Sequence, residues 1–506
     1  MSGKRRREEM NKLGKKVSIL LGLFFAGYWG YTLLSVISLD RDAAFRRRVY
    51  EYSNFVPALC VIIILLLIYK FAGQKKSGVI PEIGKKQFYI ILIVISAVAF
   101  GVQLYLMQYL GRAYRYDFGT IRRAVLSLVN DHVLYKPEYF NYYRMNRNIF
   151  YIFTRIVAVF KDWQPVIVIG IILINLSVLM AAQMCYKLTD NKGITLFIFL
   201  IGIFLYDFSI RTYMPYTDNY GAFFLIAFLF VLVNRRTNMI WMILGTISLS
   251  IGCYIKFTGG ILLIAGLIVL AGLKVQEKKV FFKKLGILAL VFMCVFGGIT
   301  KAQNSYLAKN GFVDDPECQR GFWHFFMMGQ NDQHLGTYNK RDLKFSDGFA
   351  TKKERDAANK AEGIKRIKDR GIRGNLFFYT YKNYQNYDDG CFAPVTGIYS
   401  GEEQFGDSWV ENLYLEGREN NRYYAMVQQI LWLMLLGAIM FIGIRVKSDN
   451  MFMLYIKIII LGVSAYTLLF EGRAKYLFMF VPIYLVAAGM GLNEMITIKN
   501  KLKKDI

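Results

Sequence analysis

The sequence is poor in the residues and motifs that mark most soluble enzymes. Its only histidines are His132, His324 and His334, and their spacing fits no set of metal ligands. It contains no HExxH sequence, no glycine-rich phosphate loop and no convincing nucleophile triad. The zinc-protease, P-loop and serine-hydrolase patterns are therefore missing, and no residue is predicted to bind a metal.

Acidic residues are also scarce. The chain has 36 Asp and Glu against 63 Lys and Arg, a formal net charge of +27. In a soluble protein this excess would indicate nucleic-acid binding. Here much of the charge lies in short loops and at the termini, where it sets the orientation of a membrane protein, so no nucleic-acid partner is expected.

Cysteines are few and scattered. Four of the six lie in or beside apolar runs, where cysteine behaves as a small core residue. Only Cys318 and Cys391 share a polar loop. They could form a disulfide if that loop is extracytoplasmic, which the sequence alone does not decide.

Apolar residues, in contrast, are abundant: 55% of the chain is hydrophobic and the mean hydropathy is +0.32. Apolar runs recur at the length of about 20 residues that crosses a bilayer as a helix. Lys256, Gly259 and Gly260 interrupt the run 239–273, and a hairpin there puts the flanking basic clusters on one side, so this run is divided in two. The sequence thus predicts an all-α polytopic membrane protein of about 12 transmembrane helices, near residues 17–38, 55–72, 88–109, 165–186, 193–209, 220–234, 239–256, 258–273, 285–301, 425–446, 451–470 and 476–494.

The distribution of basic residues predicts the orientation. MSGKRRREEMNKLGKK precedes a retained first span, and KNKLKKDI ends the chain. The positive-inside rule places both termini in the cytoplasm of a multi-pass plasma-membrane protein. We expect four parts: a basic tail and helical hairpin (1–87), a transmembrane core (88–301), an extracytoplasmic loop domain (302–424), and the last helices with a basic tail (425–506).

Two longer polar segments fall on the outer side. The first outer loop, 110–164, is expected to hold helices lying along the membrane surface. The larger loop, 302–424, is expected to be mainly helical: Thr351 and Glu354 form a capping box, Gly371 is a candidate helix C-cap, and an aromatic-rich helix, NLFFYTYKNYQNY, follows.

Ionisable residues recur where the predicted spans reach the outer face. Such groups are costly there unless they are paired, hydrated or functional, so they are candidate site residues. Asp117 and Asp218 are candidate catalytic acids or bases. The candidate substrate-binding residues are Arg115, Arg122, Arg123, Lys256, Glu471, Arg473, Lys475 and Tyr476.

The mixture of charges suggests transfer from a lipid phosphate. An Asp among arginines stays ionised and can deprotonate an acceptor hydroxyl, while Lys and Arg near the headgroups bind and stabilise a departing phosphate. Each candidate also has a structural interpretation. Asp117 can be salt-bridged to an arginine, Asp218 can cap a turn, Lys256 can extend to the interface, and Arg473 and Lys475 can be interfacial anchors.

Several motifs, in order, resemble those of the GT-C superfamily of integral-membrane glycosyltransferases, which includes the protein mannosyltransferases. YDFGTIRRAVLSL with NRNIFYIFTRIVAVF is similar to the family's first outer loop with its catalytic Asp, and PYTDNYGAFFLIAFLF to the segment in which an acidic turn opens the next span. YIKFTGGILLIA resembles its Lys–Pro–Thr stretch, with Phe257 where Pro is usual. EGRAKYLFMFVPIYLVAAG resembles its late Glu…Arg–Tyr…Pro segment, with Lys475 at the usual Arg. FFMMGQNDQHLGTYN and YDDGCF resemble a Gram-positive cell-surface subgroup.

This resemblance implies an inverting glycosyltransferase. The donor would be a polyprenyl-phosphate sugar, undecaprenyl-linked in a bacterium, and the acceptor a hydroxyl of a cell-envelope glycan or glycolipid in contact with the lipid bilayer. Asp117 would be the general base, and the phosphate would lie near Lys256 and Lys475. Phe118 follows Asp117 where protein mannosyltransferases have a paired Asp–Glu, so a requirement for a divalent metal is left open and no other cofactor is implied.

Three other functions compete with this one. A lipid-linked oligosaccharide flippase should have charges at mid-span, whereas these spans are mostly free of them. A polysaccharide polymerase would share the outer site and the lipid donor. A secondary transporter should show matched broken helices, and only the break at Gly259–Gly260 is visible.

Overall fold

The computed structural model describes residues 12–39, 54–71, 84–111, 116–235, 238–272, 278–393, 406, 408–444 and 450–505, and every regular element within these ranges is helical. Among the described residues, eight helices are long and apolar enough to cross a membrane, and three shorter apolar helices accompany them. The predicted all-α polytopic membrane protein is therefore confirmed.

Each apolar run predicted from the sequence coincides with a helix or with two helices in succession. Short 3-10 or π-helical turns join or extend some of them. The helices of the bundle are α1 (Lys12–Ser38), α2 (Phe55–Phe71), α3 (Lys85–Leu110), α7 (Gln164–Thr189), α8 (Lys192–Gly202) with η2 (Ile203–Asp207), η3 (Ile210–Tyr213), α9 (Thr217–Arg235), α10 (Met239–Ile255), η4 (Phe257–Gly259) with α11 (Gly260–Ala271), α12 (Lys278–Lys309), α18 (Asn421–Ile444), α19 (Met451–Leu469) and η6 (Ala474–Phe480) with α20 (Val481–Asp505).

The division of the run 239–273 into two helices is confirmed. Lys256 ends α10 in an extended conformation (φ −146°, ψ 117°), and the 3-10 turn η4 leads into α11. A Cβ atom on Gly259 would lie 3.1 Å from Leu225 Cδ2 and 3.3 Å from Cys253 Sγ, closer than most side chains allow. The turn thus fits against α9 and α10 because it carries a glycine there.

Contacts between helix ends define one end of the bundle. The backbone of Gly14 in α1 packs against Gly272, which follows α11. Lys499, late in α20, donates hydrogen bonds to the carbonyls of Tyr69 and Lys70 in α2. These segments are the ones that the positive-inside rule assigns to the cytoplasmic side. The contacts agree with that alternation; the side of the membrane remains a prediction.

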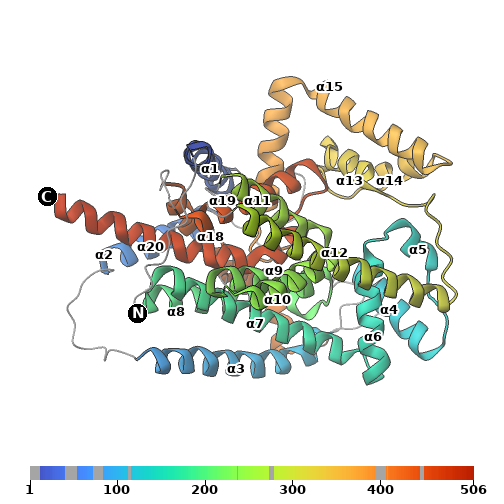
Figure 1. Cartoon of the computed structure of the whole chain (residues 1–506), viewed down its shortest axis with the longest axis horizontal. Coiled ribbons are helices and arrows are strands. Elements are labelled where there is room, and N and C mark those ends of the chain that lie inside the picture. Colours follow the sequence, from blue (N-terminus) through green and yellow to red (C-terminus); the bar gives the residue numbers. More distant parts are fainter. Residues whose placement is uncertain are drawn as a thin grey trace.

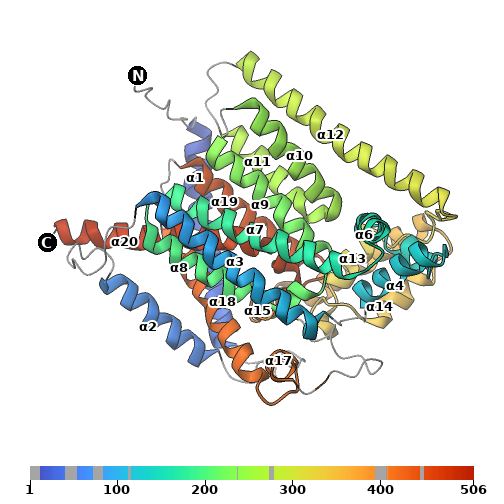
Figure 2. The same cartoon turned by 90° about the horizontal axis from the view of Figure 1, so that it is seen from below.

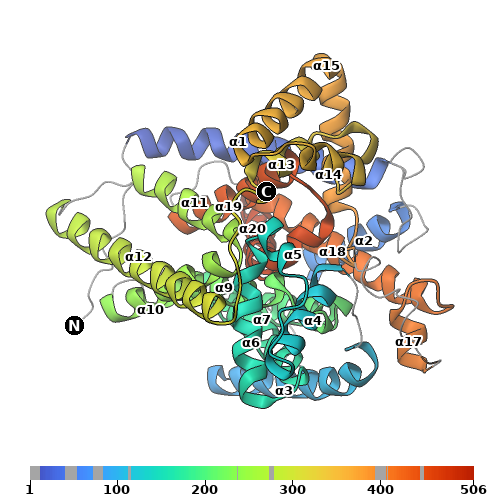
Figure 3. The same ribbon diagram turned by 90° about the vertical axis from the view of Figure 1, so that its right-hand side faces the viewer.

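Two further groups of helices lie at the other end of the bundle, on the opposite side from the C-terminal end of α20 (Figure 1). Figure 2 shows the same separation from a further direction, and Figure 3 views the molecule from the end at which these helices lie. The first group belongs to the first outer loop and the second to the larger loop. They are α4 (Tyr116–Asn130), α5 (Pro137–Tyr142) and α6 (Asn146–Phe160), followed by α13 (Phe322–Gly329), η5 (Asp332–His334), α14 (Lys340–Asp347), α15 (Lys352–Tyr387) and α17 (Trp409–Tyr414).

The expected capping box begins α15. The amide of Glu354 donates to Thr351 Oγ1 (3.2 Å), and the amide of Thr351 donates to Glu354 Oε2 (3.2 Å). Gly371, with φ 59°, separates two helical segments within α15, because glycine adopts this left-handed conformation without a steric penalty. The second segment packs against α1: Asn383 accepts from Tyr28 Oη (2.7 Å) and donates to Thr32 Oγ1 (3.0 Å).

Large aromatic side chains fill the core where these helices meet. Trp29 of α1, Tyr387 of α15, Trp432 of α18 and Tyr484 of α20 are all fully buried and pack on one another. Both indole N–H groups are satisfied: Trp29 donates to the Leu436 carbonyl (2.9 Å) and Trp432 to the Tyr387 carbonyl (2.8 Å). Buried tryptophan usually needs such a partner. The cluster joins α1 to α15, α18 and α20.

The possible disulfide between Cys318 and Cys391 is not formed. Both thiols are free: Cys318 donates a hydrogen bond to Asp315 Oδ2 (2.8 Å), and Cys391 is buried elsewhere. The two outer segments are instead joined by polar contacts. Arg320 donates its guanidinium to Tyr143 Oη (2.9 Å) and its amide to the Tyr142 carbonyl (3.0 Å).

Candidate functional site

The polar residues predicted at the outer ends of the spans gather from four separate parts of the chain. Asp117 lies in the first turn of α4, and Asp218 in the first turn of α9. Lys256 ends α10, and Glu471, Arg473 and Lys475 lie where α19 passes into α20. A helix end interrupts the apolar pattern at each position, which is why an ionisable side chain can stand there.

Asp218 and Lys256 form a buried ion pair. Lys256 Nζ lies 2.5 Å from Asp218 Oδ1, and their side chains are 15% and 3% exposed. A second cation, Arg211 in η3, approaches the other carboxylate oxygen at 3.9 Å with a side chain that is 9% exposed. A buried carboxylate needs such partners. The carboxylate of Asp218 thus faces two cations, one at each oxygen.

Tyr476 joins this pair to the segment that follows α19. Its ring is close to two lysines, with Lys256 Nζ 5.1 Å and Lys475 Nζ 5.0 Å from the ring centroid. Lys475 Nζ is also 3.9 Å from Glu471 Oε1, and its side chain keeps 31% exposure. The two lysines predicted to bind phosphate therefore both lie close to one aromatic ring.

A chain of hydrogen bonds leads from this cluster to Asp117. Tyr216, two residues before Asp218, donates to Asn146 Oδ1 (2.8 Å). Asn146 Nδ2 donates to Tyr139 Oη (2.6 Å), and Tyr139 donates to Asp117 Oδ1 (2.7 Å). Burial, first of all, and the nearby carboxylates raise the pKa of both Tyr139 and Tyr216 above the ordinary tyrosine value. Both hydroxyls keep their protons at neutral pH and donate toward Asp117.

Electrostatic interactions show that these groups form one cluster. Tyr216 interacts with the charges of Asp117, Asp218 and Glu471. Lys475 interacts with Glu471 and Asp117 in turn. Asp117, Asp218 and Glu471 thus lie around Tyr216, although they are far apart in the sequence.

The four arginines predicted to bind substrate lie in different surroundings. Arg115 lies outside the described residues. Arg123 is exposed, and its guanidinium lies 5.6 Å over the ring of Tyr135, while Arg122 and Arg473 are half-buried. Asp117 itself accepts a hydrogen bond from Tyr139.

The sequence did not predict four residues of the cluster, which are Tyr139, Asn146, Arg211 and Tyr216. Arg211 is 8% exposed, donates to the Phe392 carbonyl in the YDDGCF motif (3.2 Å), and lies 5.6 Å over the Phe478 ring. A lone arginine seven positions before Asp218, between two apolar runs, was a usable signal. The two tyrosines and the asparagine gave none, because such neutral residues are common at membrane interfaces.

No group of three or more His, Cys, Asp or Glu side chains within the described ranges is arranged to hold a metal ion. His324, the buried histidine, donates through its Nδ1 to Ser346 Oγ (2.6 Å), which in turn donates to Asn359 (2.9 Å). Burial lowers the pKa of His324 to about 4. This histidine is a neutral core residue of the larger outer segment.

Comparison with known proteins identifies the family. A family model described as a conserved hypothetical integral membrane protein matches residues 11–496, so the chain belongs to that family. No curated protein and no solved structure matches it.

Proposed function

We propose that this integral membrane protein is a glycosyltransferase. It would move a sugar from a polyprenyl-phosphate donor to a hydroxyl of a cell-envelope glycan or glycolipid. The observation that carries the proposal is the convergence of Asp117 with Lys256, Lys475 and Tyr476 at one end of the bundle. A base and phosphate-binding cations are the two things such a reaction needs. The resemblance to GT-C glycosyltransferases supports the same reaction.

Asp117 is the better candidate for the base. It is half-exposed, and the hydroxyl of Tyr139 fixes one of its carboxylate oxygens at 2.7 Å. Asp218 is nearly fully buried and already paired with Lys256. We therefore assign Asp218 to holding Lys256 and Arg211 in place, and only Asp117 to proton transfer.

The phosphate of the donor would lie near the ring of Tyr476, between Lys256 and Lys475. Lysine ammonium groups bind phosphate as point charges, and a partly dry site strengthens that attraction. Lys475 keeps enough exposure to reach a headgroup, and Lys256 is anchored by Asp218.

In the proposed step, Asp117 takes the proton of the acceptor hydroxyl as its oxygen attacks the anomeric carbon. A new bond forms between the acceptor oxygen and that carbon, and the bond from that carbon to the phosphate oxygen breaks. The electron pair leaves with the lipid phosphate, whose negative charge the two lysines stabilise. This is a single displacement with inversion.

Asp117→Asn tests the proposal, because the amide keeps the shape but cannot accept the proton. We expect transfer in vesicles supplied with a polyprenyl-phosphate sugar to fall by at least about a hundredfold, the usual contribution of a general base. Asp131→Asn is the matched control, since Asp131 is exposed just beyond the other end of α4. Full activity of Asp117→Asn would remove Asp117 as the base, and product length would distinguish a single transfer from polymerisation.

A further inference from the structure

The C-terminal end of α19 is held by side chains from the larger outer segment. A helix leaves its last carbonyl groups without partners inside the helix. Here consecutive carbonyls each accept a side-chain hydrogen bond from α15 or from the turn after α13. The bonds run from Asn386 to Thr467 (3.3 Å), from Lys382 to Leu468 (2.8 Å), from Gln330 to Leu469 (2.9 Å) and from Lys382 to Phe470 (2.7 Å).

Lys382 makes the central contacts. Its side chain is fully buried, and its Nζ also donates to the Gly329 carbonyl at 2.5 Å. The three acceptors match the three hydrogens of an ammonium group. Burial lowers the pKa of Lys382, whereas the three carbonyl acceptors and the dipole at the helix C-terminus favour its charged form. Lys382 therefore pins the end of α19 to the end of α13.

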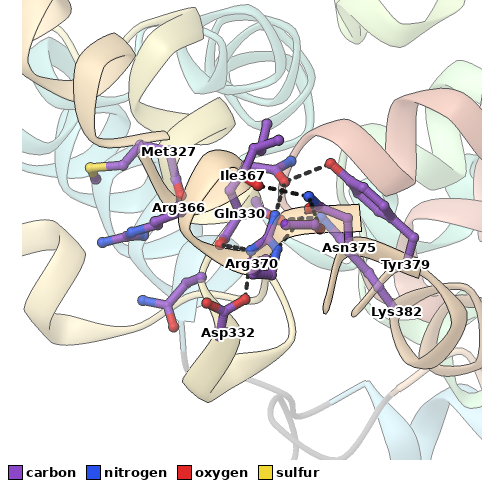
Figure 4. A network of polar contacts seen from close by, with 12 residues as sticks. Met327, Gln330, Asp332, Arg366, Ile367, Arg370, Asn375, Tyr379 and Lys382 are labelled. Carbon is purple, nitrogen blue, oxygen red and sulfur yellow. Dashed lines mark hydrogen bonds and ion pairs between the residues drawn. The ribbon is translucent and has the colours of Figure 1, made fainter. Parts of the chain in front are cut away.

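Neighbouring residues hold Gln330 in position through further hydrogen bonds (Figure 4). Arg370 and Tyr379 both donate to Gln330 Oε1, at 2.9 and 2.8 Å, which directs Gln330 Nε2 toward Leu469. The same arginine donates to the Gln330 carbonyl (2.7 Å) and to Asp332 (2.5 Å). Contacts within the outer segment thus orient Gln330 for its hydrogen bond to α19.

The turn that follows α19 is held in the same way. The amide of Gly472 donates to the Gly336 carbonyl (3.1 Å), and Gln385 donates to the Gly472 carbonyl (3.2 Å). A Cβ atom on Gly336 would lie 2.5 Å from Lys382 Nζ, so the lysine fits only because position 336 is a glycine. Glu471 comes directly after the last carbonyl that Lys382 caps.

We propose that Lys382 is a positioning residue for residues 471–475, because it fixes the end of α19 so that Glu471 and Lys475 face Tyr476 and Lys256. The larger outer segment then does more than cover the bundle: it sets the geometry of the candidate phosphate-binding lysine. The catalytic part of this inference rests on the proposed function. The structural part does not.

Lys382→Met tests the inference, because it keeps the length of the side chain and removes all three hydrogen bonds. We measure amide hydrogen exchange of residues 470–476 in the purified full chain and, separately, donor affinity and turnover. We expect exchange there to rise by at least about tenfold, the change that a loss of about 1.4 kcal/mol of local stability produces. Donor KM should rise more than kcat falls.

Arg355→Met is the matched control on the same helix. Arg355 is 6% exposed and donates to the carbonyls of Ser346 (3.0 Å), Glu317 (2.5 Å) and Phe349 (3.2 Å), but none of these belongs to α19. It should destabilise the outer segment without faster exchange at 470–476. If Lys382→Met does not fold, Gln385→Met provides the milder variant, with the same expected direction.

The inference is overturned if Lys382→Met leaves exchange at 470–476 unchanged, or if Arg355→Met raises it equally. If the wild-type chain transfers no sugar, the proposed function fails while the exchange experiment still decides whether Lys382 positions the segment. Faster exchange with unchanged donor KM would contradict the catalytic part alone.

Discussion

The buried pair of Asp218 and Lys256 offers the sharpest quantitative prediction. Asp218→Asn removes the charge that faces Lys256 at 2.5 Å and Arg211 at 3.9 Å while keeping the shape of the side chain. Both cations are mostly buried, so water cannot replace the lost carboxylate. Breaking a buried pair by removing one partner costs about 3–5 kcal/mol. We expect a loss of this size in the free energy of unfolding.

The double variant Asp218→Asn/Lys256→Gln separates pairing from general disruption. With both charges gone, only Arg211 has lost a charged partner, so the double variant should lose less stability than the two single variants added together. We expect a coupling of about 2 kcal/mol, within the range for residues in direct contact. Unfolding in detergent micelles, followed by tryptophan fluorescence across a denaturant series, gives the free energy of unfolding of the wild type, the two single variants and the double variant.

The pair of Lys352 and Asp356 is the internal control. Their atoms also approach closely, at 2.8 Å, but their side chains are 36% and 24% exposed and lie one turn apart on α15. Asp356→Asn should cost less than about 0.5 kcal/mol because solvent screens the pair. The reasoning is refuted if Asp218→Asn costs no more than Asp356→Asn, or if the two single changes at Asp218 and Lys256 are additive within about 0.5 kcal/mol.

Two further predictions concern pH and donor binding. Burial lowers the pKa of His324 to about 4, so between about pH 6.5 and 4 the unfolded chain binds more protons than the folded chain. The free energy of unfolding should therefore fall by up to about 3 kcal/mol as the pH drops through this window. If His324→Asn shows the same dependence of unfolding free energy on pH as the wild type, this prediction is contradicted. Lys475→Ala should weaken binding of a polyprenyl phosphate by about tenfold or more, without a comparable loss of thermal stability. Equal affinity of this variant and the wild type in a vesicle-binding assay would count against Lys475 as a phosphate ligand.

Most of the fold was predictable because the bilayer imposes a strong pattern on the sequence. Apolar runs of spanning length located each bundle helix, and the break at Gly259–Gly260 correctly divided the hairpin. The same alternation placed Asp117, Asp218 and Lys475 at one end, where the structure brings them together.

The parts that were not predicted depend on contacts between distant segments. Nothing in the local sequence around Lys382 indicates that its ammonium group caps the end of α19, about 86 positions along the chain. Asp117 accepts from Tyr139, which in turn accepts from Asn146, and nothing in the local sequence around Asp117 indicates either contact. Cys318 and Cys391 share a loop in the sequence, but each has its own surroundings in the fold.

The aromatic cluster of Trp29, Tyr387, Trp432 and Tyr484 has a consequence for biogenesis. Trp29 in α1 donates its indole N–H to Leu436, a residue 407 positions later. Until α18 and α20 have been inserted, the indole of Trp29 lacks that acceptor and the ring of Tyr484. These contacts of α1 therefore form only late in synthesis, and in a nascent chain stalled before α18 the indole of Trp29 would lack them.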